Sequence, residues 1–169
     1  MKKLLVCTVI AVFAFSKMNA QENIVKFNPL ALVVGVVEVG YERVLSDSQS
    51  IQIDLGYASF NSGAFDYTGF AAGLQYRFYV QKAKSAPVGW FVGPFANYSS
   101  AKSDNGGSDF KTTVFAAGGV IGYQWNWEPI TLDIYGGPAY YSINADDDAF
   151  NFGFDGLGAR LGFSLGFSF

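Results

Sequence analysis

The most regular hydrophobic pattern in the sequence covers residues 157–169. Apolar side chains occupy every odd position of this run, and glycine, serine or arginine occupies every even one. Successive side chains on a strand point to opposite sides, so this strict period of two predicts a β-strand with one fully apolar face. The opposite face is small or polar and carries Arg160.

Seven earlier segments alternate in the same way. They cover residues 24–33, 36–45, 51–61, 70–81, 90–100, 110–127 and 130–142. Turns at 46–50, 82–89 and 128–129 separate them on one side, and polar loops at 62–67, 102–109 and 144–155 on the other. The pattern predicts an all-β, eight-stranded antiparallel up-and-down barrel, with the chain termini and mostly short turns at one end.

Three prolines fall inside predicted strands, at Pro29, Pro94 and Pro138. Proline has no N–H to donate to the sheet, so it breaks a ladder bond. We therefore expect a β-bulge at each site, and a bulge can exchange the inward and outward faces beyond it. The sequence therefore leaves open which face each side chain takes beyond these prolines.

Residues 1–20 have the features of a cleavable signal peptide. Lys2 and Lys3 precede an apolar run over 4–15, and Ala20 offers a small residue for cleavage. The apolar run is too short to span a bilayer as a helix. We therefore assign residues 1–20 to the signal and 21–169 to one barrel domain. Cleavage removes the single cysteine, Cys7, so disulfides cannot stabilise the remainder.

The predicted mature chain has eight basic and 14 acidic residues, a net charge of −6. It lacks the basic surface that nucleic-acid binding requires. No run of 18 apolar residues follows residue 20, so a membrane-spanning form must be a closed barrel. The non-apolar strand faces are small and mixed in character rather than rich in Lys and Glu. This favours apolar side chains toward lipid and polar ones in a narrow lumen.

The strand phase collects charged residues on the lumen side. They are Lys26, Glu38, Glu42, Asp54, Arg77, Asp133 and Arg160. One interpretation is a salt-bridge network that plugs the barrel, and the other is a polar pathway for a solute. We favour the plug, because an eight-stranded barrel is just wide enough for its own side chains to fill.

All three tryptophans flank turns on the terminal side of the predicted barrel. They are Trp90, Trp125 and Trp127. Tryptophan favours the boundary between membrane and water, so we expect a periplasmic aromatic girdle at these positions.

The final strand resembles the carboxyl-terminal assembly signal of bacterial outer-membrane barrels. The residues that carry this likeness are Leu161, Phe163, Leu165, Phe167 and Phe169. Residues 24–169 as a whole resemble the small OmpX/OmpA-type outer-membrane barrels, through the runs at 26–30, 39–43 and 89–95 and the last strand. The resemblance implies a monomer in the outer membrane of a Gram-negative bacterium. Its partners would be lipid, lipopolysaccharide, the outer-membrane assembly machinery and an extracellular ligand for the loops.

Three functions remain open. The leading one is a structural or surface-interaction barrel, the second is a narrow channel for small solutes, and the third is a soluble lipocalin-like ligand-binding barrel. The small residues opposite the apolar faces argue against the third. An enzyme is not expected, because the chain has no histidine and no recognisable Ser–Lys pair. We expect no catalytic residue, cofactor or metal site, and the acidic run at 146–148 does not match a Ca²⁺ loop.

Overall fold

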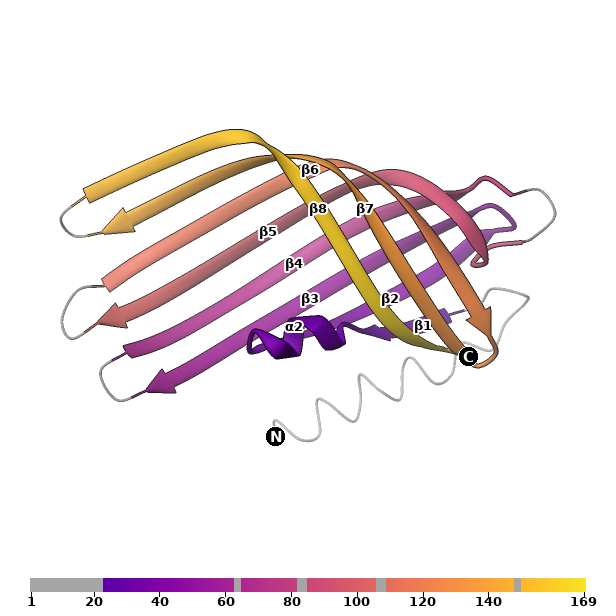
Figure 1. Ribbon diagram of the computed structural model, residues 1–169, viewed down its shortest axis with the longest axis horizontal. Helices are drawn as coiled ribbons and strands as arrows, with labels where there is room; N and C mark the ends of the chain where they lie inside the picture. The colour runs from indigo at the N-terminus through magenta and orange to yellow at the C-terminus, as the bar shows by residue number, and fades with distance from the viewer. Residues whose placement is uncertain (1–22, 63–64, 82–84, 106–108, 148–149) are drawn as a thin grey trace.

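The computed structural model of the protein describes residues 23–62, 65–81, 85–105, 109–147 and 150–169. They form a closed antiparallel barrel in which eight strands pair in chain order (Figure 1). The predicted fold class, an all-β eight-stranded barrel, is therefore confirmed. The predicted signal peptide at 1–20 lies outside the described residues. No helix within the described ranges is long and apolar enough to cross a membrane.

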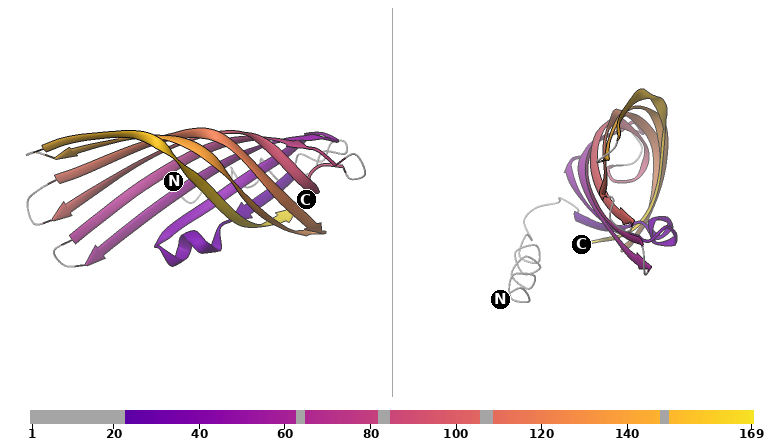
Figure 2. Two further views of the ribbon diagram at one scale, coloured as in Figure 1. Left: turned by 45° about the horizontal axis from the view of Figure 1, so that its top comes forward. Right: turned by 90° about the vertical axis from the view of Figure 1, so that its left-hand side faces the viewer.

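The strands become longer from β1 to β6, and β7 and β8 are of similar length to β6. Their bounds are β1 Asn23–Phe27, β2 Val36–Ser46, β3 Gln49–Ser62, β4 Phe65–Tyr79, β5 Gly89–Asn105, β6 Asp109–Trp127, β7 Ile130–Asp147 and β8 Phe150–Ser168. Asn23 and Phe169 exchange backbone hydrogen bonds at one end of the barrel. We call this the terminal end, and the opposite end, where β3–β4, β5–β6 and β7–β8 reverse, the hairpin end (Figures 1 and 2).

The loops predicted at 62–67, 102–109 and 144–155 are wrong, because strands run through most of these residues. The β5–β6 ladder continues to the Asp104–Asp109 pair, and the β7–β8 ladder continues to Asp147 and Phe150. Polar side chains do not prevent this, since the ladder bonds are made by the backbone. Once two neighbouring strands are in register, each added pair satisfies further N–H and C=O groups. The eighth strand thus begins at Phe150 instead of residue 157.

The first strand, predicted over 24–33, is also wrong beyond Phe27. Pro29–Val33 forms a short helix, α2, instead. The Asn28 side chain accepts hydrogen bonds from the N–H groups of Leu30 and Ala31, and Pro29 occupies the first turn. Asparagine at the N-cap followed by proline is a favoured helix start, because proline needs no donor there. Gly35, with φ of 78°, then returns the chain into β2.

The β-bulges expected at Pro94 and Pro138 are not found. Pro94 pairs with Gly119 and Pro138 with Ala159, and the register is the same on both sides of each. On the other edge of β5, pairs are skipped opposite Pro94 and resume without a shift. Gly93 helps there, since a Cβ on it would lie 1.7 Å from the Tyr76 carbonyl oxygen. The inward and outward phase therefore persists along both strands.

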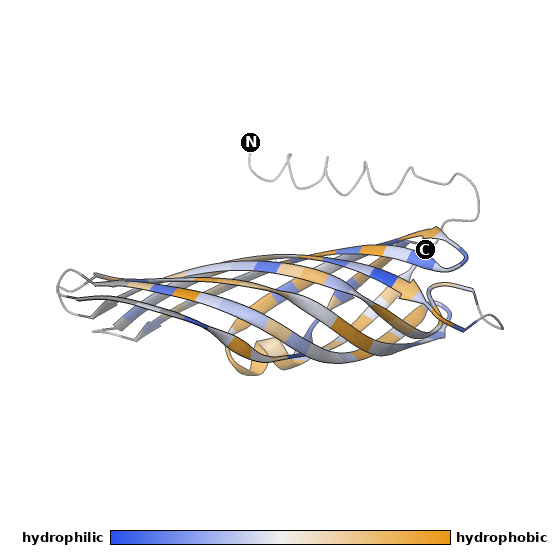
Figure 3. Ribbon diagram, turned by 90° about the horizontal axis from the view of Figure 1, so that it is seen from above, coloured by the Kyte–Doolittle hydropathy of each residue, from blue (hydrophilic) through white to orange (hydrophobic). Residues whose placement is uncertain are grey.

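The outer face of the barrel carries an apolar belt between two bands of aromatic residues, which we call the aromatic rings. At the terminal end the outward aromatic residues include Tyr76, Phe78, Trp90, Tyr123, Trp125 and Trp127. Near the hairpin end a second outward set is formed by Tyr57, Phe70, Tyr98, Phe115 and Tyr140. Exposed aliphatic residues lie between them, including Ile53, Leu55, Leu74, Ile121, Ile134 and Leu161. Apolar and polar residues alternate along the strands accordingly (Figure 3).

Candidate functional site in the lumen

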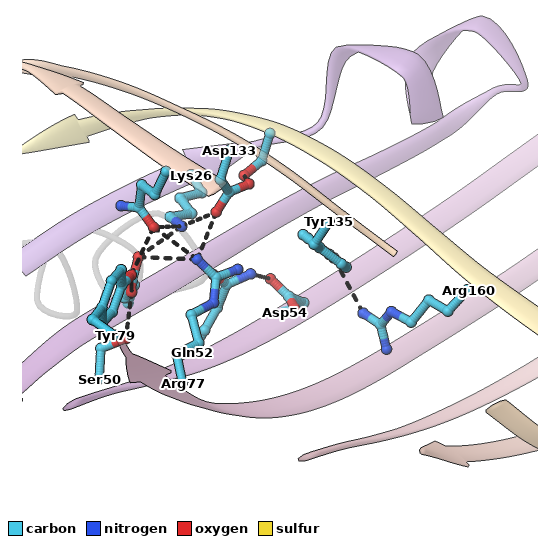
Figure 4. A network of polar contacts seen from close by, with 12 residues as sticks. Lys26, Ser50, Gln52, Asp54, Arg77, Tyr79, Asp133, Tyr135 and Arg160 are labelled. Atoms are coloured by element: carbon cyan, nitrogen blue, oxygen red, sulfur yellow. Dashed lines mark hydrogen bonds and ion pairs between the residues drawn. The ribbon is translucent and has the colours of Figure 1, made fainter. Parts of the chain in front are cut away.

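Four charged side chains meet inside the barrel near its terminal end (Figure 4). Lys26 Nζ lies 2.6 Å from Glu42 Oε2 and also pairs with Asp133. Arg77 Nη1 lies 2.6 Å from Asp133 Oδ2 and 3.5 Å from Glu42 Oε2. All four residues are buried. We call them the ionic cluster; its two cations and two anions balance in charge.

Neutral groups complete the ionic cluster. Gln124 Oε1 accepts hydrogen bonds from Lys26 Nζ at 3.3 Å and from Arg77 Nη1 at 2.8 Å. The Tyr79 hydroxyl oxygen lies 2.8 Å from Glu42 Oε1 and 2.9 Å from Gln124 Oε1. Buried charges need such partners, because an ion removed from water without hydrogen bonds is strongly destabilising.

Two serine hydroxyl groups also bind the carboxylates of the ionic cluster. Ser50 donates to Glu42, and Ser164 donates to Asp133. Four strands, β1, β2, β4 and β7, supply the charges, and β3, β6 and β8 supply hydrogen-bonding groups. The cluster therefore joins residues far apart in sequence across the barrel lumen.

Small residues make room for the cluster. Lys26 pairs with Gly40 on β2 and with Gly166 on β8. A Cβ on Gly166 would lie 2.3 Å from Thr131 Oγ1 and 3.1 Å from Lys26 Cγ. The lysine stem can thus enter the lumen only because both flanking positions lack a side chain.

Buried aromatic side chains pack next to the ionic cluster toward the hairpin end. The Arg77 guanidinium carbon lies 4.3 Å from the centre of the Phe91 ring. Phe91 belongs to a buried group with Tyr79, Phe95 and Tyr135. Together the ions and rings fill the lumen at the terminal end, and an arginine over an aromatic face adds cation–π attraction.

The other three predicted lumen charges face inward but lie apart from the ionic cluster. Asp54 Oδ1 accepts a hydrogen bond from Gln52 at 2.7 Å, and Glu38 accepts one from the Asn28 amide at 2.8 Å. Arg160 donates to the Tyr135 hydroxyl at 3.3 Å, to one side of the cluster in Figure 4. The structure therefore brings together four of the seven charges predicted for one network.

Sequence reasoning did not assign the hydroxyl partners of the cluster. Ser50, Tyr79 and Ser164 occupy inward positions on strands whose residues alternate between apolar and polar. Their position in that alternation was the signal that could have identified them as lumen residues. The second aromatic ring was missed as well. It contributes one residue per strand, and only the pairing register aligns those residues around the barrel.

The predicted girdle and assembly residues all take outward positions. Trp90, Trp125 and Trp127 lie at the terminal end, with Trp125 stacked on Trp127 at 6.5 Å between ring centres. Among the residues of the predicted assembly signal, Leu161, Leu165, Phe167 and Phe169 are exposed, whereas Phe163 is half-buried.

Comparison with known proteins places the chain in a family. A family model described as "Protein of unknown function (DUF3575)" matches residues 5–150. The chain belongs to this DUF3575 family. Membership of the OmpX/OmpA-type barrels specifically stays a prediction.

Among solved structures, the DUF3575 chain is similar to the translocator domain of the autotransporter NalP from Neisseria meningitidis. The match has 13% sequence identity and a TM-score of 0.39, and it covers 97% of this chain and 67% of that chain. No curated protein matches the sequence.

Proposed function

We propose that the protein is an integral outer-membrane β-barrel with a structural or surface-interaction role, a lumen plugged at its periplasmic end and hairpins exposed outside the cell. The observation that carries the proposal is the apolar belt between two aromatic rings. A soluble protein rarely exposes so large an apolar surface. A membrane barrel needs one, with aromatic residues at both boundaries with water.

The height of the belt supports the membrane location. The apolar alternation on β8 runs from Leu157 to Phe169. At a rise of about 3.3 Å per residue and a tilt of about 45°, this run is roughly 28 Å tall. The apolar band of bacterial outer-membrane barrels is about 25 Å tall. Beyond the second ring the outward residues turn polar, as at Asn61, Lys102 and Lys111.

Heat-modifiable migration tests the membrane barrel. The full-length chain would be expressed, outer membranes isolated, and the protein run on a detergent gel with and without boiling. We expect it in the outer-membrane fraction, with faster migration of the unboiled sample. Recovery from the soluble periplasm without a heat shift would contradict the proposal and favour a lipocalin-like barrel. That alternative is disfavoured by the apolar side chains on the outer face.

The ionic cluster favours a plugged lumen over a channel. Arg77 and Glu42 have no exposed surface, and Lys26 and Asp133 have almost none. A narrow channel is the second candidate, and planar-bilayer recording separates the two. We expect no unitary conductance from the wild-type barrel. Steady ion conductance in wild type would overturn the plug.

The remaining parts of the proposal concern partners and chemistry. We infer a non-enzymatic monomer that contacts lipid and lipopolysaccharide and is delivered by the outer-membrane assembly machinery through its last strand. The absence of histidine supports the non-enzymatic role. The hairpins, which continue past the apolar belt, would meet an extracellular ligand. Hairpin-shortened strains with normal adhesion and envelope integrity would count against a surface role.

A further inference from the structure

The lumen is hollow on the hairpin side of the ionic cluster. A cavity of about 540 Å³ lies there, within the range of small-molecule binding sites. Its inward lining comes from five neighbouring strands, β2–β6, and consists mostly of small residues, among them Gly56, Ala58, Ala71, Ala101 and Val114, together with the aromatic residues Tyr67 and Phe110. Lys102 also borders the cavity but occupies an outward position. The inward lining therefore carries no charged residue and suits an apolar ligand.

A smaller and more polar pocket of about 210 Å³ adjoins this cavity. It is bordered by Asn28, Glu38, Asn97, Tyr135 and Arg160. Inward residues of the two pockets follow one another directly along three strands. They are Val36 and Glu38 on β2, Ser99 and Asn97 on β5, and Val114 and Ala116 on β6. The polar pocket is thus the layer between the apolar cavity and the ionic cluster.

Arg160 is the cation of the polar pocket. Its guanidinium carbon lies 4.3 Å from the centre of the Phe95 ring, and Nη2 donates to Tyr135. Arg160 takes part in none of the four ion pairs of the ionic cluster, each of which involves Lys26 or Arg77. The nearby carboxylate, Glu38, binds the Asn28 amide. Arg160 is therefore held in place with donors that an incoming anion can use.

The barrel wall is interrupted beside this polar pocket. The described β1–β8 ladder ends at Phe27 and Leu165, so β8 from Ser164 to Phe150 has no strand partner on that side. The exposed apolar helix α2 lies against β2 and β8 there (Figure 1). Leu161 faces outward in the apolar belt, with 84% of its surface exposed, yet it also borders the pocket of Arg160. The pocket therefore reaches the outer face of the barrel within the belt.

We propose that the lumen binds a single-chain amphiphile with a carboxylate head, a molecule of fatty-acid type. The carboxylate accepts hydrogen bonds from Arg160 and Tyr135, and the chain occupies the apolar cavity. The ligand enters sideways through the wall break beside α2. This entry route rests on the proposed membrane location, whereas the binding site itself does not. The Glu38 carboxylate repels the negative head of the ligand and so lowers the affinity of the barrel for it.

Retention of radiolabelled dodecanoate by the mature barrel in phosphatidylcholine nanodiscs tests the site, with dodecanol as the uncharged probe. Heat-modifiable migration first establishes folding of each variant, so a failure of the barrel itself is recognised separately. We expect saturable binding of about one dodecanoate per barrel above lipid-only nanodiscs. Binding of dodecanoate that never saturates, or that equals the lipid-only background, would overturn the proposal.

Matched variants test where the hydrocarbon chain and the carboxylate of the ligand bind. Ala71→Trp fills the cavity and should reduce binding of both probes at least about tenfold, whereas Ala72→Trp on the lipid face should not change it. Ala101→Phe replaces Ala71→Trp if the latter does not fold. Arg160→Gln should weaken dodecanoate about tenfold without affecting dodecanol, and Glu38→Gln should strengthen dodecanoate alone. Equal effects of Ala71→Trp and Ala72→Trp, or no effect of Arg160→Gln, would refute the site.

Discussion

Removal of the Arg77 guanidinium is the sharpest test of the plug. In Arg77→Ala, Glu42 and Asp133 would share a single cation, Lys26, and one negative charge would remain uncompensated inside the lumen. Breaking a buried ion pair from one side costs about 3–5 kcal/mol. Loss of the contact with Phe91 adds up to about 2 kcal/mol when the cation is desolvated. We therefore expect a loss of about 5 kcal/mol in the free energy of unfolding.

Equilibrium unfolding in urea measures this loss for the barrel refolded into phosphatidylcholine vesicles, with tryptophan fluorescence as the signal. Glu42→Ala should likewise lower the stability and the unfolding temperature. A double-mutant cycle separates pairing from packing. Because Arg77 contacts Asp133 directly, Arg77→Ala/Asp133→Ala should cost about 0.5–3 kcal/mol less than the sum of the single variants.

Arg43 provides the matched control, since it is an exposed outward arginine near the same end of the barrel. A charge near the membrane boundary changes stability by about 0–1 kcal/mol, so Arg43→Ala should stay within that range. Stability of Arg77→Ala within about 1 kcal/mol of wild type would refute the plug, as would strict additivity in the cycle.

Helix α2, the close approach at Gly93 and the tryptophans of the terminal end each offer an independent test. Asn28→Ala removes the α2 cap, at a local cost of about 1 kcal/mol, and should speed hydrogen exchange at the capped amides without altering exchange in β6. Gly93→Ala should abolish the heat-modifiable folded band, because its Cβ would collide with the Tyr76 carbonyl oxygen. Gly119→Ala is the control and should fold, because the nearest atom to its Cβ lies 3.9 Å away. Equal folding of both variants would show that the close approach at Gly93 is unimportant. Brominated lipids should quench the fluorescence of Trp90, Trp125 and Trp127 more strongly when bromine lies near the headgroup than near the chain end; the opposite order would place the girdle away from the membrane boundary.

Local pattern was sufficient for much of the barrel. Alternation with a period of two predicted eight strands, and it put Lys26, Glu42, Arg77 and Asp133 on the same side of the sheet. The phase held through Pro94 and Pro138, because the β4–β5 and β6–β7 ladders resume in the same register beyond the pairs that are missing there. Capping chemistry was also present in the sequence at Asn28 and Pro29, although the apolar run that followed suggested a strand.

The strand count, the two faces and the inward position of the charges follow from local periodicity and polarity, which are present in the sequence. Which of these charges meet depends on how the strands pair in the folded barrel. Arg160 shares the phase of Arg77 but stacks on Phe95, because pairing registers set its height in the barrel. The second aromatic ring, the cavity lined by Ala71 and the wall break beside α2 likewise depend on how separate strands align. This alignment is set when distant segments pair to close the barrel, and a local sequence pattern does not contain it.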